Sequence, residues 1–136
     1  MESNDRCKNK DIANDMFIAK AVLYFLRNYK GEYCLTITKL KFLCILYIRK
    51  FNEKFNTNHS ELSGDDFNLL LYKLKFGDFI DISEPVLMNK HVWTKVELTK
   101  EWYSSDEWAM LNLILDTYAD VPSLYLYDTV YNIKKK

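Results

Sequence analysis

The sequence contains little of what usually builds a chemical site. Its three glycines, Gly31, Gly64 and Gly77, lie far apart. A phosphate-binding loop needs glycines close together, so no such loop can form from local sequence. The two histidines, His59 and His91, have no acidic or thiol partner at the spacing of a metal motif. We therefore expect no bound cofactor and no metal.

Cysteine is scarce as well. Cys7, Cys34 and Cys44 are odd in number and form no C-x-x-C pair, which argues against a disulfide framework or a zinc ribbon. Cys44 falls on the apolar face of a predicted helix, where a thiol is usually a core residue. No G-x-S-x-G nucleophile motif is present. We expect no catalytic residues and predict that the protein is not an enzyme.

Long hydrophobic runs are also absent. No apolar segment reaches the about 20 residues that span a bilayer. Residues 1–10 are polar and lack the apolar stretch of a signal peptide. The prediction is a cytoplasmic protein with no membrane partner.

Apolar and aromatic residues are plentiful in this chain of 136 residues. Hydrophobic residues make up 49% of it and aromatic residues 15%, enough to build one core without disulfides or metals. We predict a single domain over residues 1–136, with an ordered core at about 11–131. The polar N-terminus and the Lys-rich tail, residues 134–136, are expected to be flexible.

Charge is balanced overall but divided between the two halves. Residues 1–60 carry eleven basic and six acidic side chains, whereas residues 61–136 carry eight basic and thirteen acidic ones. This division indicates either a basic face for an acidic partner or two halves that attract each other in the fold. We favour the second interpretation.

Helical periodicity dominates the chain. Two long helices are predicted, over residues 11–29 and from Thr36 or Thr38 to residue 55. A shorter helix over 66–76 follows Ser63, which stands three residues before Asp66 as in a capping box. The apolar positions that carry the first two predictions are Ile12, Met16, Ala19, Leu23, Leu26 and Tyr29, then Leu40, Leu43, Cys44, Tyr47, Ile48, Phe51 and Phe55.

Breaks and strand signals separate the helices. Gly31 and Gly77 are expected to end the first and third helices, and residues 79–82 and 91–98 predict a β-hairpin with a long connection at 83–90.

Two more helices are expected in the C-terminal part of the chain. The first follows the capping-box pair Ser104 and Glu107, and the last follows Pro122. Their apolar positions are Trp108, Leu111, Leu115 and Tyr118, then Leu124, Tyr127, Val130 and Tyr131. The predicted fold class is mainly α with a small β-hairpin (α+β), with about five helices around one core.

Three segments together resemble the SocA-like antitoxin domain, or Panacea domain, of toxin–antitoxin systems. The block Ile37–Tyr47 is similar to the early helix of that family, and Leu111–Asp120, continuing to Leu126 and Tyr131, is similar to its closing helices. Between them, Tyr72–Phe79 keeps an aromatic residue and a glycine but lacks the proline of the family's tyrosine–glycine–proline motif.

The resemblance implies a non-enzymatic module that neutralises a partner protein, a toxin or a defence effector, by direct contact. An alternative is a phage-encoded inhibitor of a host defence complex. Candidate partner-binding residues lie around the altered motif and the hairpin: Tyr72, Phe76, Phe79, Trp93 and Trp102. The sequence leaves the oligomeric state and the identity of the partner open.

A winged-helix DNA-binding regulator is a further alternative, because residues 66–98 place a hairpin directly after a short helix. That helix offers Lys73 and Lys75 against Asp65 and Asp66. Contacts to phosphate supply most of the affinity of DNA-binding proteins, so this charge balance argues against a nucleic-acid partner.

Overall fold

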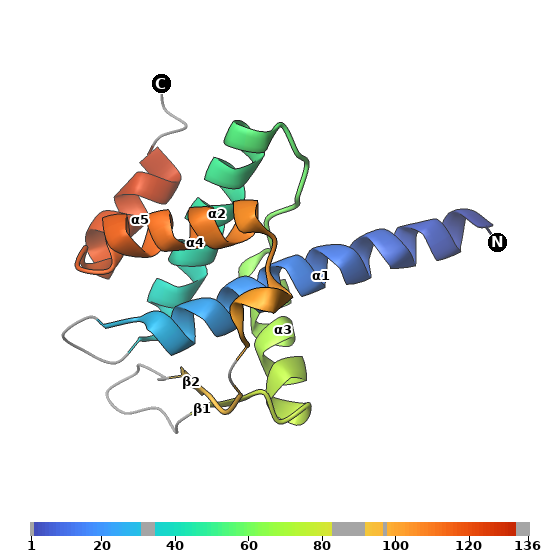
Figure 1. The fold of residues 1–136 in the computed structure, drawn as a ribbon, viewed down its shortest axis with the longest axis horizontal. Helices are drawn as coiled ribbons and strands as arrows, with labels where there is room; N and C mark the ends of the chain where they lie inside the picture. Colours follow the sequence, from blue (N-terminus) through green and yellow to red (C-terminus); the bar gives the residue numbers. More distant parts are fainter. Residues whose placement is uncertain (1, 31–34, 83–91, 97, 133–136) are drawn as a thin grey trace.

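The computed structural model describes the whole chain except residues 1, 31–34, 83–91, 97 and 133–136. The described part is mainly helical, with one two-stranded antiparallel sheet, which confirms the predicted fold class (Figure 1). Gly31, the 83–90 connection and the tail at 134–136 lie outside the described residues. The elements in order are α1 (Glu2–Asn28), α2 (Ile37–Phe55), α3 (Gly64–Phe76), β1 (Ile80–Ile82), β2 (Val92–Thr94), the 3-10 helix η1 (Lys100–Trp102), α4 (Ser105–Tyr118) and α5 (Ser123–Asn132).

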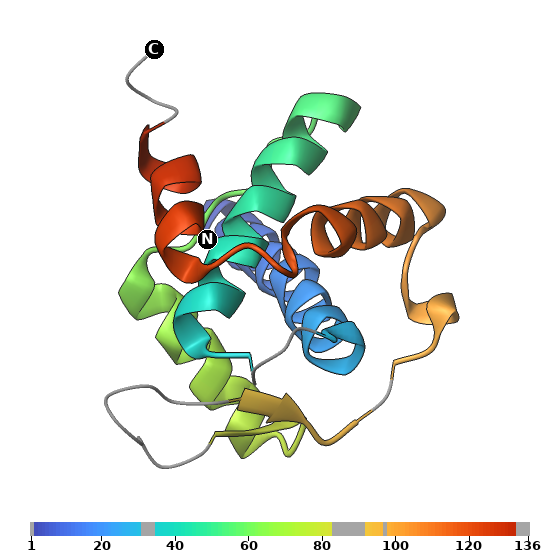
Figure 2. The ribbon, with the colours of Figure 1, turned by 90° about the vertical axis from the view of Figure 1, so that its left-hand side faces the viewer.

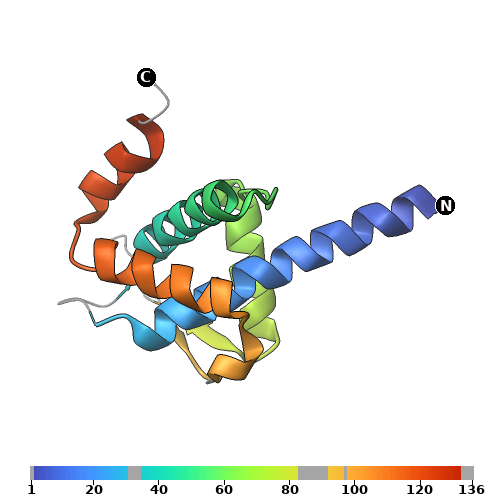
Figure 3. The same ribbon diagram turned by 45° about the horizontal axis from the view of Figure 1, so that its top comes forward.

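Helix α1 passes through the middle of the molecule. It packs against α2, α3, α4 and β2, and its N-terminal half extends away from the other elements (Figures 1 and 3). The helix begins at Glu2 rather than at residue 11. Although α1 has 27 residues, neither it nor any other helix in the described part of the chain is long and apolar enough to cross a membrane.

The predicted apolar stripe of α1 is confirmed only in part. Ala19, Leu26 and Tyr29 are partly buried against the core, but the buried surface of the helix is wider than one stripe. Met16 is exposed and Leu23 is buried, whereas Ile12 lies outside the residues whose burial the structure describes. A helix with neighbours on several sides buries residues around most of its circumference, so a one-sided period does not describe it. Among residues 13–28 of α1, whose burial the structure describes, the buried ones are Phe17, Ile18, Ala21, Val22, Leu23, Tyr24 and Phe25.

Helix α2 buries the apolar positions predicted for it, Phe55 only in part, and it buries Phe42, Ile45 and Leu46 as well. Of the two threonines expected as a cap, Thr36 has this role, because its Oγ1 accepts a hydrogen bond from the Lys39 backbone N at 3.2 Å. Leu40, Leu43 and Tyr47 are almost completely buried. Because both α4 and α5 pack on it, α2 holds the C-terminal half of the chain in place.

The start of α4 is fixed by a complete capping box. Ser104 Oγ accepts from the Glu107 backbone N at 3.1 Å, and Glu107 Oε1 accepts from the Ser104 backbone N at 2.8 Å. The same carboxylate lies 2.9 Å from Lys20 Nζ on α1. Glu107 is the buried charged residue of the described core. Its carboxylate caps α4 and links this helix to Lys20 of α1.

Helix α5 buries only one of its four predicted apolar positions, Val130, together with Leu126. Leu126 and Val130 are completely buried, whereas Leu124 is 72% exposed and Tyr127 and Tyr131 are also exposed. Two residues four apart are enough to meet a core that touches only one side of a short helix. The apolar positions 124, 127 and 131 are left exposed, although the rings of Tyr127 and Tyr131 still contact the buried ring of Phe42 on α2.

The hairpin is present but shorter than predicted. β1 and β2 pair antiparallel, with Ile80 opposite Thr94 and Ile82 opposite Val92. Ile80 and Val92 are buried and anchor the sheet to the core. As predicted, α3 ends at Gly77, although the left-handed residue is the following Asp78, with φ of 67°.

Contacts between the basic and the acidic half support the second interpretation of the charge division. Lys20 pairs with Glu107, and Arg49 Nε lies 2.8 Å from Glu61 Oε2. Two cations of α2 also reach backbone carbonyls of the C-terminal helices. Lys39 Nζ donates to the Ala119 oxygen at 2.5 Å, and Arg49 Nη1 donates to the Val130 oxygen at 2.5 Å.

Candidate functional site

Helix α3 has two apolar faces, and only one of them is needed for the fold. Its inner face consists of four buried residues: Phe67, Leu70, Leu71 and Leu74. Its outer face carries Leu69, Tyr72 and Phe76, which the i, i+3, i+7 spacing places on the side opposite the core. Leu69 is 53% exposed and Phe76 is 88% exposed. We call Leu69, Tyr72 and Phe76 the α3 ridge.

Phe79 extends the exposed aromatic surface beyond the end of α3. The turn is closed by hydrogen bonds from the Asp78 backbone N to the Lys75 oxygen and from the Phe79 backbone N to the Leu74 oxygen, at 3.0 and 2.9 Å. A Cβ atom at Gly77 would lie only 3.0 Å from the Phe79 ring. The turn therefore places this ring against the C-terminal end of the helix, where it remains exposed.

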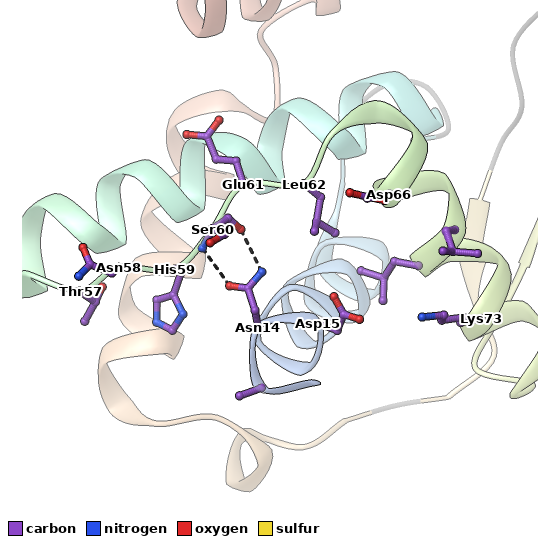
Figure 4. Close-up of a pocket in the computed structure, with 13 residues that line it drawn as sticks. Asn14, Asp15, Thr57, Asn58, His59, Ser60, Glu61, Leu62, Asp66 and Lys73 are labelled. Carbon is purple, nitrogen blue, oxygen red and sulfur yellow. Dashed lines mark hydrogen bonds between the residues drawn. The ribbon is translucent and has the colours of Figure 1, made fainter. Parts of the chain in front are cut away.

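A pocket of about 950 Å³ lies along one flank of α3 (Figure 4). Its walls are α1 at residues 13–15, the segment 57–62, and the α3 residues Asp66, Leu69, Leu70 and Lys73. Leu69 therefore belongs both to the pocket and to the α3 ridge. Asp66 and Lys73, which stand near opposite ends of α3, share this flank.

The segment 57–62 is held in place by side-chain amides. Asn14 of α1 donates to the Ser60 oxygen at 3.1 Å and accepts from the Ser60 backbone N at 3.0 Å (Figure 4). Asn52 of α2 bridges the His59 backbone in the same way, at 2.9 and 3.0 Å. Because both amides satisfy backbone groups of a loop, this wall of the pocket is preformed.

His59 lines the pocket, but its ring is engaged in packing. It stacks on Phe17 with ring centroids 3.6 Å apart and an interplanar angle of 4°, and its edge meets Phe51. Burial lowers the pKa of His59, and the charge of Glu107 opposes that shift in part. This imidazole stays neutral near pH 7 and stabilises the joint between α1 and the 57–62 segment.

Other titratable groups in the interior are likewise placed for packing. Burial raises the pKa of the Cys44 thiol, which keeps it protonated and unreactive. Burial and the charge of Asp116 raise the pKa of Tyr24 to about 12, and its hydroxyl donates to Asn112 Oδ1. Among the residues that the structure describes, no group of three or more His, Cys, Asp or Glu side chains is arranged to hold a metal ion.

The structure brings together three of the five residues predicted as a binding site. Tyr72, Phe76 and Phe79 are exposed along α3 and the turn after it. Trp102 is 60% exposed on η1, but η1 lies on the other side of α1 from α3 (Figure 2). Trp93 lies in β2, and its side chain is outside what the structure describes.

Sequence reasoning missed Leu69 and the exposed face of α5. The signal for Leu69 was present, because α3 contains apolar residues at helical spacing on two opposite sides. A short helix can bury only one such side against its own core, so the second is left for solvent or for a partner.

Comparisons of this chain with protein-family models, with curated proteins and with solved structures found no match.

Proposed function

We propose that this protein is a non-enzymatic binding module that neutralises a partner protein by direct contact through the α3 ridge, in the manner of an antitoxin. The observation that carries the proposal is the outward apolar face of α3, above all Phe76 at 88% exposure. Covering an exposed phenylalanine contributes about 1.5 to 3 kcal/mol. Aromatic anchors on a helix are a common way to fill a groove on another protein.

Rigidity of α3 supports the same proposal. The inner face is anchored in the core, and the N-terminus is capped by Ser63, whose Oγ accepts from the Asp66 backbone N at 3.2 Å. Little conformational entropy is then lost when the outer face binds, so more of the contact energy contributes to affinity.

The arrangement of charged groups favours binding over catalysis in this proposal. Glu107 is held by Lys20 and Ser104, and the His59 ring is stacked on Phe17. An enzyme needs titratable groups that converge on a substrate with freedom to exchange protons. The groups described here that have perturbed surroundings are committed to packing and capping.

An inhibitor of a host defence complex, encoded by a phage, would use the same physical mechanism and differ only in its partner. A winged-helix regulator has less support. The hairpin does follow α3, but the outer face of α3 is apolar and its first turn carries Asp65 and Asp66. A helix that reads DNA needs positive charge at that position.

Partner retention by matched variants tests the proposal. The tagged chain, expressed from its native locus, is compared with Leu69→Ser/Phe76→Ser and with the control Leu113→Ser/Leu124→Ser, which replaces two equally apolar exposed residues elsewhere. We expect the wild type and the control to retain one partner protein in stoichiometric amount. Both should also relieve the growth arrest that the partner causes when it is expressed alone. The ridge variant should lose both effects while keeping its helical circular dichroism.

Two results would contradict the proposal. One is the absence of any stoichiometric protein partner, and the other is equal retention by the ridge variant. A shift of promoter DNA that weakens steeply with salt would instead favour the winged-helix alternative.

A further inference from the structure

The charges of α3 are arranged so that the helix is complementary to a reversed copy of itself. Asp65 and Asp66 stand in the first turn, and Lys73 and Lys75 stand in the last turn. The exposed Leu69 and Tyr72 lie between them, and Phe76 lies at the C-terminal end. With an acidic end, an apolar middle and a basic end, the charges of α3 are complementary to those of an antiparallel neighbour.

We propose that two copies of this chain pair through their α3 ridges, antiparallel and related by a two-fold axis near residue 70. When two helices of residues 64–76 overlap along their full length, residue numbers facing each other sum to about 140. Asp66 then lies opposite Lys73 of the second copy, and Asp65 lies opposite its Lys75. Two-fold symmetry forms each of these pairs twice.

The apolar residues match in the same register. Leu69 faces Leu69 and Tyr72 of the second copy across the axis, and Phe76 lies over the first turn of the opposite helix. Asp66 and Lys73 line the same pocket and so share one flank of α3. A two-fold axis between antiparallel helices keeps that flank on the same side in both copies, so the two charges can meet.

Neither of these two charges has a partner within its own helix. Asp66 and Lys73 are seven residues apart, about 10.5 Å along the helix axis, which is beyond the reach of an ion pair. Both are exposed, and neither forms an ion pair within the described part of the chain. A parallel pairing would place Asp66 against Asp66 and Lys73 against Lys73, so the charges select the antiparallel arrangement.

The dimer should be weak. A single helix of 13 residues from each copy covers less than the about 800 Å² per partner of a standard protein complex. Its population will therefore depend on protein concentration. One ridge cannot hold a second copy and another protein at once, so the proposed partner would compete with self-association.

Reversing each charge separately, and then mixing the two variants, tests this pairing. Sedimentation equilibrium is measured over a concentration series for the wild type, for Asp66→Lys, for Lys73→Asp and for an equal mixture of the two variants. With increasing concentration, the apparent mass of the wild type should rise from the monomer mass of 16.3 kDa toward twice that value. Each variant alone should associate about tenfold more weakly, because symmetry counts each reversed pair twice.

The mixture provides the decisive result. Asp66→Lys carries lysine at both positions 66 and 73, and Lys73→Asp carries aspartate at both. A heterodimer of the two variants therefore regains both attractive pairs. We expect the mixture to associate within a few-fold of the wild type. The control Lys100→Asp on η1, which makes the same change in net charge as Lys73→Asp, should associate as the wild type does.

A wild type that keeps the monomer mass at the highest concentration overturns the pairing. It is also overturned if the mixture associates no better than its separate components, or if Phe76→Ser associates like the wild type. These outcomes leave the proposed function intact, since partner retention by the ridge variants is measured separately.

Discussion

Helices α3 and α5 carry the same exposed pattern but place it in different surroundings. Each presents leucine, tyrosine and an aromatic residue at i, i+3 and i+7: Leu69, Tyr72 and Phe76 on α3, and Leu124, Tyr127 and Tyr131 on α5. The contrast lies in what the rings touch within the chain.

The aromatic rings of α5 are partnered. Tyr127 and Tyr131 have centroids 4.6 Å apart, and their rings meet Phe42 of α2 at 6.1 and 6.2 Å. Both also carry a hydroxyl that water can solvate. Phe76 has no hydroxyl and no ring contact with a described residue, and it is the most exposed large hydrophobic side chain in the described part of the chain. Exposure alone therefore does not distinguish the two helices, whereas the lack of ring partners and of a polar group separates Phe76 from the tyrosines of α5.

The largest expected difference is between Phe42 of α2, which lies under the α5 tyrosines, and Phe76, which is exposed on α3. Phe42→Ala removes the buried ring under the α5 tyrosines, so the free energy of unfolding should fall by about 3 to 5 kcal/mol. Phe76→Ala should change it by less than about 0.5 kcal/mol. Urea unfolding of both variants measures the difference. A similar loss for Phe76→Ala would mean that the ridge packs within its own chain.

Removing the cap of α3 should have an intermediate effect. Ser63→Ala leaves the Asp66 backbone N–H without its acceptor, which should cost about 1 kcal/mol of stability. Ser105, which is exposed and lies one residue past the cap of α4, offers a matched control as Ser105→Ala. Thermal unfolding followed by circular dichroism compares the two. Equal melting temperatures for both variants would remove the argument that the cap holds the ridge rigid.

Replacing one ring by leucine should give a smaller difference in the free energy of unfolding between α5 and α3. Tyr127→Leu loses edge and tilted contacts to two rings and should lower the free energy of unfolding by about 0.5 to 1 kcal/mol. Phe76→Leu should leave it unchanged within about 0.5 kcal/mol. If Tyr127→Leu proves neutral in urea unfolding, the ring cluster on α5 contributes nothing and the comparison fails.

The smallest expected effect is a pH dependence of local stability. It should appear in the segment 57–62, next to α3, rather than in α5. The unfolded chain binds a proton at His59 near pH 6.5, whereas the folded chain holds that pKa lower. The unfolded state then binds more protons as pH falls, so stability is present above pH 6.5 and decreases below it. Hydrogen exchange near pH 7 and pH 5 should show protection lost at residues 57–62 before α5.

A matched variant isolates that effect. His59→Phe keeps an aromatic ring on Phe17 but cannot titrate, so the loss of protection at low pH should disappear. If it persists unchanged, another group is responsible for it.

Local signals in the sequence predicted the fold well where local chemistry decides it. Thr36, Ser63 and Ser104 cap their helices as expected, because a cap needs only a side chain and a backbone amide three residues away. The buried faces of α1 and α5 were predicted only in part. Which side of a helix is buried depends on how many neighbours surround it, and that is set by the whole fold.

The candidate site was predictable only in part, for a related reason. The aromatic residues Tyr72, Phe76 and Phe79 were found from their types, but their shared outward face follows from the burial of the opposite side of α3. Trp102 was grouped with them because it is near the hairpin in sequence. In space it belongs to η1, on the other side of α1 (Figure 2).

The contacts from α2 to the carbonyls of Ala119 and Val130 bear on how far this sequence can vary. Every residue type has a backbone oxygen, so these two bonds do not depend on the side chains at positions 119 and 130. They do require a long cation at positions 39 and 49. Libraries of random substitutions should therefore tolerate a wider range of residues at position 119, where the side chain is only partly buried, than at Lys39 or Arg49.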